Sequence, residues 1–483
     1  MATKDSMQTS AGSWALLGSL VSEDAHIVSL LRKAGAVIIG HSNMSEWASV
    51  RSKSYSTGYS PRGGQTRNPY DLSSSPFGSS SGSAVAVSTN IVPISFGTET
   101  DTSIIGPASI NGVVGIKPTV GLTSRHGIIP ISKNFDTVGT FGRTVADAVH
   151  GLTAIASKDS REIPSEFAAT IEEGGFSASL STQTALRGAQ FGLPQKRCWQ
   201  LVPQGCKHVA QTLFKAIEKA GATIVDVDFP CAEERISSDG SWNWQVIILE
   251  PDQSREHGEE AKSEYTVVKA DAYNGINEYL SNLKSSQIRS VEDIIAFNEQ
   301  NTGTGGAFPG DHPAFPTGQM LFFLNVSQDN LHEIAQTKGS EDDTYHAALK
   351  HVQSQTRENG IDAALRHKND DGTVLELDAL LLCDRKGAGQ QLAAQAGGSS
   401  SNLSSTPGLP ERGYPIICIP IGVDTAGLPV SLSLQHTAWK GATLIKWASA
   451  IEDLVQHVFG GRPQPTYKNC HSKNIPINKP PTD

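Results

Sequence analysis

The sequence predicts an α/β fold, in which helices pack on a β-sheet. Two helix–glycine–strand units support this prediction. In the first, Asp24–Ala34 has apolar residues at helical spacing, Gly35 follows, and Ala36–Ile39 has the composition of a short buried strand. In the second, Val209–Phe229 contains a helix that ends near Gly221 and then an apolar strand. Repeated units of this kind are typical of a sheet that is covered by helices.

The remaining elements follow from local composition. Residues 51–82 are rich in Ser, Gly, Pro and Arg, which predicts mostly loop. Residues 84–89 are predicted to be helical and residues 91–96 extended. Near the end of the chain we expect two strands around a turn and then a helix: Tyr414–Ile421, Leu428–Leu434, a turn at Asp424–Gly427, and Leu444–Val455.

Composition excludes several classes of protein. The 483 residues carry a net charge of −10 without long basic clusters, which argues against nucleic acid as a ligand. No apolar run reaches the roughly 18 residues that a membrane span needs, and the first residues lack a signal-peptide core, so we expect a cytoplasmic protein without a membrane partner. The six cysteines are scattered without a CxxC pair, so neither a metal site nor a disulfide framework is expected.

Two turns of small residues indicate a candidate catalytic site. Gly78–Gly82 contains Ser79, and Thr100–Ser103 ends in Ser103, 24 residues later. A helix and a strand between them could return both hydroxyls to one edge of the sheet, beside free backbone N–H groups, which suits serine-based acyl transfer. Taken alone, a Gly-Ser run is more often a flexible linker. A phosphate-binding loop is improbable because the required lysine is absent.

The sequence around these turns resembles the amidase signature family. The likeness rests on Gly97–Ser103, Pro107 and Gly112–Thr119, and it extends along nearly the whole chain. Further similar strings are Leu31–Val37, Asn43–Trp47, Gly63–Gln65, Asn68–Tyr70, Val291–Asn298, Asp378–Leu380, Gly413–Pro415 and Pro420–Gly422. The sequence is most similar to the fungal acetamidase-like members, which are related to fatty-acid amide hydrolase and to the amidase-like subunit of glutamyl-tRNA amidotransferase.

The resemblance implies a single amidase domain over residues 1–483. It has a central mixed sheet covered by helices on both faces, and its active site lies where the serine turns meet. The signature core covers about 60–150, an irregular insertion of about 232–345 shapes the substrate pocket, and strands and a helix follow at about 411–460. The implied substrate is a small-molecule amide, no cofactor or metal is needed, and a homo-oligomer is left open.

The family's catalytic roles can be carried over residue by residue. Ser103 matches the nucleophile that attacks the amide carbonyl and becomes acylated. Ser79 matches the bridging serine, which follows a cis peptide bond and relays the proton. The backbone N–H groups of Thr100, Asp101, Thr102 and Ser103 match the oxyanion hole, which is the substrate-binding part of this prediction.

The third member of the family's triad is a lysine within a Lys-Asp-Asn segment. Met1–Asp5 matches residues that follow this segment, so the lysine has no counterpart and we expect the chain to be truncated at its N-terminus relative to the family. Lys4 is considered as a substitute base, but a surface lysine is the ordinary interpretation, because a catalytic lysine needs a buried site that depresses its pKa.

Other departures from the family also bear on activity. Phe77 and Thr102 stand where glycine is usual, Ile105-Gly106 is unusual after the nucleophile, and Ser431 replaces a glycine in the C-terminal strand. A threonine at 102 would tolerate a positive φ badly. His126 is interpreted as a solvated loop residue, and Asp101 as a local turn cap.

Four hypotheses remain open from the sequence. The first is an amidase that hydrolyses a carboxamide C–N bond through a serine acyl-enzyme. The second is a non-catalytic amidase fold that acts as a binding or assembly subunit. The third is an incomplete gene model whose true start lies upstream, and the fourth is an amidotransferase subunit that passes ammonia to charged tRNA.

Overall fold

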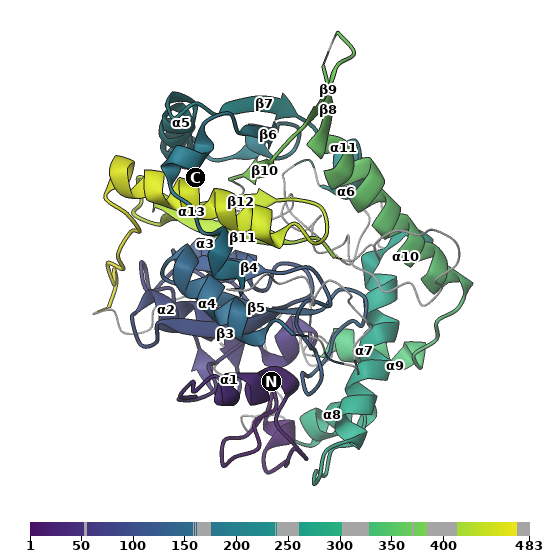
Figure 1. Cartoon of the computed structure of the whole chain (residues 1–483). Helices are drawn as coiled ribbons and strands as arrows, with labels where there is room; N and C mark the ends of the chain where they lie inside the picture. Colours follow the sequence, from purple (N-terminus) through teal and green to yellow (C-terminus); the bar gives the residue numbers. More distant parts are fainter. Residues whose placement is uncertain are drawn as a thin grey trace.

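A computed structural model describes residues 1–52, 56–157, 159, 161, 175–236, 238, 260–301, 328–369, 371–383 and 413–470. Its centre is an eight-stranded sheet in the order β3-β5-β4-β11-β12-β10-β6-β7 (Figure 1). The strands are β3 Ile94–Glu99, β4 Val114–Lys117, β5 Thr137–Gly142, β6 Gln190–Pro194, β7 Thr223–Val227, β10 Ala379–Leu382, β11 Ile416–Val423 and β12 Pro429–Gln435. Neighbours from β3 to β10 run antiparallel, whereas β10, β6 and β7 run parallel, so the predicted mixed sheet is confirmed.

Side chains that alternate along the strands build a core on each face of the sheet. On β11, Ile417 and Ile419 pack into a cluster with three helices, whereas Ile416 and Cys418 pack into a cluster on the other face. The first cluster includes α4 Val145–Ile155, α5 Gln204–Lys219 and α13 Gly441–Phe459. The second includes α2 Ser81–Ser88, α3 Ile105–Ile110, α6 Ala232–Arg235 and α11 Asp362–Leu365. Helices therefore cover both faces, as predicted.

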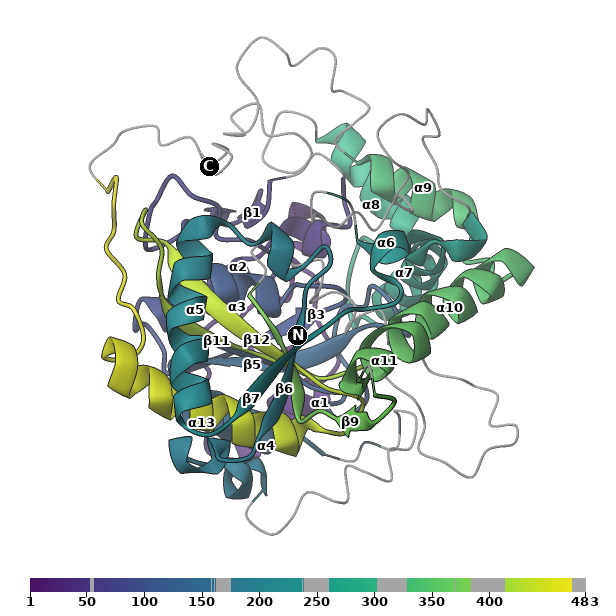
Figure 2. The same cartoon turned by 90° about the horizontal axis from the view of Figure 1, so that it is seen from above.

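A layer of helices from the second half of the chain lies beside this sheet. It contains α7 Glu264–Ser281, α8 Val291–Gln300, α9 Asp329–Thr337 and α10 Asp343–Thr356. Figures 1 and 2 show these helices along one side of the molecule, away from α5 and α13. The expectation of an irregular region at 232–345 is therefore wrong for its described parts, because apolar residues of α7, α8 and α9 share a buried cluster. Several aromatic residues of this region (Trp242, Trp244, Phe308, Phe315, Phe322 and Phe323) lie outside the described residues. The same holds for Gly387–Pro410, whose Gly- and Ser-rich composition predicts a loop.

The elements predicted near the serine turns are confirmed with small shifts. The expected helix at 84–89 is part of α2, and the strand expected at 91–96 begins later, as β3. Two short hairpins complete the described strands: β1 Tyr59–Ser60 with β2 Gly64–Gln65, and β8 Arg366–Lys368 with β9 Val374–Glu376. None of the described helices is long and apolar enough to span a bilayer.

The first helix–glycine–strand unit is only half right. The helix is present as α1 His26–Lys33, but Ala36–Ile39 forms no strand. Val37 is 86% exposed and Ile39 is 66% exposed. A strand needs a hydrogen-bonding neighbour, and no described strand pairs with this segment. Burial of one such side chain would stabilise the fold by roughly 1.5–3 kcal/mol, which is why an apolar run predicts a buried strand. The run does not show whether a neighbouring strand is present to pair with it.

Candidate active site

The structure brings the two serine turns into contact. The first turn leads into α2, and β3 leads through Thr100 into the second turn, which precedes α3. The backbone N–H of Ser80 donates to the carbonyl oxygen of Ser103 over 3.3 Å. The segments that carry Ser79 and Ser103 are therefore adjacent, which the helix and strand between them were expected to allow.

Ser79 is buried, and its backbone is hydrogen-bonded to a neighbouring segment. The Gly78–Ser79 peptide bond is cis, and the side chain of Ser79 is 2% exposed. Its carbonyl oxygen accepts a hydrogen bond from the N–H of Ser45 over 3.1 Å. Its Oγ has no hydrogen-bond partner among the described residues, so it does not bond to the Oγ of Ser103 here. Catalytic hydrogen bonds are often long before substrate binds, and the pairing of these hydroxyls remains a prediction.

The predicted oxyanion turn has one N–H group that is already engaged. Oδ1 of Asp101 accepts from the N–H of Thr102 over 2.6 Å, which is the local cap expected from the sequence. Burial raises the pKa of Asp101. No described residue accepts a hydrogen bond from the N–H of Ser103, which leaves that donor available to a developing oxyanion.

Two buried residues of opposite charge, Glu99 and Lys117, lie near the turn, and the sequence did not indicate them. Oε2 of Glu99 accepts from the N–H groups of Ile104 and Ile105 over 2.6 and 2.8 Å, which satisfies the start of α3. Nζ of Lys117 donates to the carbonyl oxygen of Tyr414 over 2.8 Å. Burial raises the pKa of Glu99 and lowers that of Lys117, and their opposite charges counteract both shifts. The available signal was one charged residue at the end of each apolar strand.

Two departures from the family pattern compensate one another. Phe77 has a φ of 57°, in the left-handed region that favours glycine. Its ring occupies the space above Gly106, where a Cβ atom would lie only 2.3 Å from Cε1 of Phe77. The large residue at 77 is therefore accommodated by the absence of a side chain at 106.

The other two departures are also accommodated. Thr102 is buried, and it does not have the positive φ that would make a β-branched residue unfavourable there. Oγ of Ser431 donates to the carbonyl oxygen of Ser109 on α3 over 3.1 Å. The polar group that replaces a glycine in β12 is thus satisfied, and the scaffold of the two turns is intact.

Neither Lys4, the substitute base considered from the sequence, nor the loop residue His126 reaches the serines. Lys4 is exposed, and its backbone N–H donates to Asp24. Nε2 of His126 lies 2.7 Å from Oε1 of Glu23, at the surface. Neither side chain has a hydrogen bond to Ser79 or Ser103.

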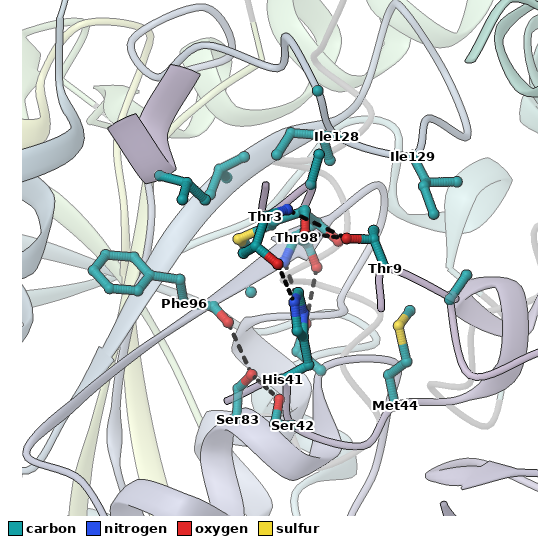
Figure 3. Close-up of a pocket in the computed structure, with 18 of the residues that line it drawn as sticks. Thr3, Thr9, His41, Ser42, Met44, Ser83, Phe96, Thr98, Ile128 and Ile129 are labelled. Atoms are coloured by element: carbon teal, nitrogen blue, oxygen red, sulfur yellow. Dashed lines mark hydrogen bonds between the residues drawn. The ribbon is translucent and has the colours of Figure 1, made fainter. Parts of the chain in front are cut away.

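A large cavity of about 2370 Å³ lies beside the serine turns (Figure 3). Its lining includes Thr98 and Thr100 of the β3 region and the exposed segment 36–39, but neither Ser79 nor Ser103. Figure 3 shows polar pairs within it: Oγ1 of Thr3 lies 2.9 Å from Nε2 of His41, and Oγ of Ser42 lies 2.8 Å from Oγ of Ser83. The cavity follows the outer edge of β3 and reaches Ser80 and Thr100, one residue of each serine turn.

Comparison with known proteins identifies the family. A family model described as Amidase matches residues 1–281. A "Putative amidase" of Schizosaccharomyces pombe is 42% identical over 99% of this chain and 75% of its own length. A glutamyl-tRNA(Gln) amidotransferase subunit of an Anaeromyxobacter species is 30% identical over 92% of this chain and 79% of its own length. The crystal structure of native peptide amidase from Stenotrophomonas maltophilia superposes with a TM-score of 0.74 at 35% identity, over 96% of this chain and 82% of that one.

This chain therefore belongs to the amidase family. The family match covers α1 to α7 and thus both serine turns, and the structural match extends over almost the whole chain.

Proposed function

We propose that this protein hydrolyses the C–N bond of a small carboxamide through an acyl-enzyme on Ser103. The contact between the serine turns supports the proposal, because Ser103 accepts a hydrogen bond from Ser80, which directly follows the buried Ser79, and Oγ of Ser79 has no partner among the described residues. A buried hydroxyl without a partner is costly in a folded protein and is retained most readily where chemistry uses it.

The proposed reaction has two steps, acylation of Ser103 and hydrolysis of the acyl-enzyme. In the first, Oγ of Ser103 attacks the carbonyl carbon, and its proton passes through the hydroxyl of Ser79 to the leaving nitrogen as the C–N bond breaks. In the second, water attacks the acyl-enzyme, restores the Ser103 hydroxyl and releases a carboxylic acid. N–H groups of the turn from Thr100 to Ser103 stabilise the oxyanion in both steps, and that of Thr102 first has to leave its bond to Asp101 in order to contribute. One such donor is worth about 10²–10³ in rate.

A base must accept the serine proton, and this requirement supports a second candidate function. From the resemblance we infer no counterpart of the family's catalytic lysine in this sequence, and Lys4 is exposed. Without such a base the same fold would act as a non-catalytic binding or assembly subunit. The unpartnered Oγ of Ser79 is compatible with this interpretation too, because the hydroxyl lacks the partner that would activate it.

Labelling with a fluorophosphonate distinguishes these candidates. The hydrolase proposal predicts a phosphonylated Ser103 that is located by mass spectrometry of digested protein, with loss of fluoride. Ser103→Ala should abolish the label and any ammonia release, and Ser79→Ala should slow labelling about 10²-fold. Lys4→Ala is the matched control and should leave the rate unchanged. An unlabelled Ser103 in folded protein would favour the binding subunit.

The finer features of the proposal follow the resemblance. We infer a fungal acetamidase-like member with one domain, working in the cytoplasm, and the closeness of the Schizosaccharomyces pombe relative supports this grouping. The region 232–345 would contribute to the substrate pocket. The similarity to an amidotransferase subunit keeps ammonia transfer as a lesser alternative, which the copurification of partner subunits would reveal.

A further inference from the structure

A continuous set of buried and partly buried hydrogen bonds begins at the oxyanion turn. Oγ1 of Thr100 donates to Oδ1 of Asp136 over 2.7 Å. Asp136 is only 8% exposed. Thr100 is the first residue of the turn, so a bond to its side chain fixes the point from which the following N–H groups are oriented.

The second oxygen of Asp136 organises the loop that precedes β5. Oδ2 accepts from the N–H groups of Ile131 and Ser132 over 2.7 and 2.9 Å, and the N–H of Asp136 donates to the carbonyl oxygen of Ser132 over 3.0 Å. The cation that faces this group is Arg125, whose Nη1 lies 3.4 Å from the carbonyl oxygen of Asp136. One carboxylate therefore joins the oxyanion turn to the 131–136 loop.

The loop is joined in turn to two helices of the side layer. Oγ of Ser132 donates to Oδ2 of Asp271 on α7 over 2.5 Å. The hydroxyl of Tyr345 on α10 donates to Oδ1 of the same carboxylate over 2.8 Å. Nδ2 of Asn134 lies 2.9 Å from Oδ2 of Asp271 and 2.8 Å from the Tyr345 hydroxyl. All four side chains are buried, and a satisfied network of this kind is rigid.

We propose that Asp136 and Asp271 are positioning residues, through which the helices α7 and α10 set the geometry of the oxyanion turn. The path runs from Tyr345 through Asp271, Ser132 and Asp136 to Thr100. This proposal rests on the proposed function in one respect, namely that the turn from Thr100 to Ser103 forms the oxyanion hole. The hydrogen bonds themselves span two layers of the fold, which local loop packing alone would not require.

Thr100 provides a matched pair of variants for the first link. Thr100→Val keeps the shape of the side chain but removes the hydroxyl, whereas Thr100→Ser keeps the hydroxyl. Thr100→Val should slow fluorophosphonate labelling of Ser103 about tenfold, the size expected for one hydrogen bond to a charged group, and Thr100→Ser should restore most of the rate. Equal rates for the two variants would overturn the proposal.

Hydrogen–deuterium exchange tests the remote links without any need for catalysis. Ser132→Ala and Tyr345→Phe should each accelerate exchange in a peptide that spans residues 100–104 by about three- to tenfold. Glu376→Gln is the control, since it breaks an exposed ion pair with Arg366 in the β8–β9 hairpin, which has no bond to this network. Adding Thr100→Val to Ser132→Ala should give little further acceleration, because both changes interrupt one path.

The two proposals can fail separately. If Ser103 is never labelled but remote variants accelerate exchange in the turn, the hydrolase proposal fails and the positioning network stands. If Ser103 is labelled and Ser132→Ala and Tyr345→Phe leave exchange in the turn unchanged, the positioning proposal is wrong.

Discussion

Phe77 and Gly106 show how one residue determines what is tolerated at another. Each departs from the family pattern, and each viewed alone in the sequence suggests a damaged site. The structure places the Phe77 ring in the space that a side chain at 106 would need. Two apparently harmful changes therefore form one compatible pair, which a single sequence without the fold could not reveal.

This pairing predicts a non-additive effect on stability. Gly106→Ala should lower the free energy of unfolding by about 1–3 kcal/mol, because its Cβ would overlap the Phe77 ring. In a Phe77→Gly background the same change should be neutral or stabilising by up to about 1 kcal/mol, since alanine favours α3. Denaturant unfolding of the four proteins measures the coupling.

A helix glycine in open space provides the control. Gly441 begins α13, and no atom lies within 4 Å of the position that a Cβ would take there, so Gly441→Ala should not depend on residue 77. Additive effects of Phe77→Gly and Gly106→Ala would contradict the pairing.

At the level of elements, sequence periodicity was most reliable where a segment satisfies its own hydrogen bonds or pairs with a near neighbour. α5, α13 and the β11–β12 hairpin were predicted with small errors at their ends. Ala36–Ile39 failed because strand formation depends on a distant partner, which composition does not encode. The helices between 260 and 345 were missed because their burial comes from packing against each other.

The candidate site was predictable to a similar extent. The two serine turns and the local bond of Asp101 followed from the motif and from short-range chemistry. The bond from Thr100 to Asp136 and the network around Asp271 join segments that are 36 or more residues apart, so no local pattern indicates them.

The contact between α13 and α4 carries a titratable group. Both carboxylate oxygens of Glu452 on α13 accept from the N–H of Val145 at the start of α4, over 2.9 and 3.1 Å. Burial raises the pKa of Glu452 to about 7, and the nearby Asp147 and Asp453 add to the shift. Between about pH 4.5 and 7 the folded state thus retains a proton that the unfolded state has lost.

The free energy of unfolding should accordingly fall as the pH rises through this range. Glu452→Gln keeps an acceptor for Val145 but cannot titrate. Over this pH range the free energy of unfolding of the variant should therefore fall by roughly 2 kcal/mol less than that of the parent protein. Urea unfolding at several pH values checks this. Glu218→Gln, at an exposed position of α5, should keep the parent slope. Parallel slopes for the parent and Glu452→Gln would show that this carboxyl does not set the pH dependence.

At the scale of the whole molecule, the eight-stranded sheet has two terminal strands with different surroundings. β7 packs against α5, whereas the outer edge of β3 lines the large cavity together with the exposed segment 36–39. On this edge the backbone groups of Phe96 and Thr98 already bond to the side chains of Ser83 and Ser80. The exposed apolar side chains of Val37 and Ile39 beside a terminal strand nevertheless favour association with a second chain.

This edge should govern how the protein behaves at high concentration. Replacing Val37 and Ile39 together by lysine should reduce self-association in light scattering, because charge opposes the approach of a second chain. Val374→Lys, at a 51% exposed position of the β8–β9 hairpin, should have little effect. If scattering is the same in all three proteins, the β3 edge does not drive association. If only the double variant stays monodisperse, the exposed segment 36–39 beside β3 is the surface that causes aggregation during purification and storage. Lysine substitutions there would then be the first change to make in a sample for crystallisation.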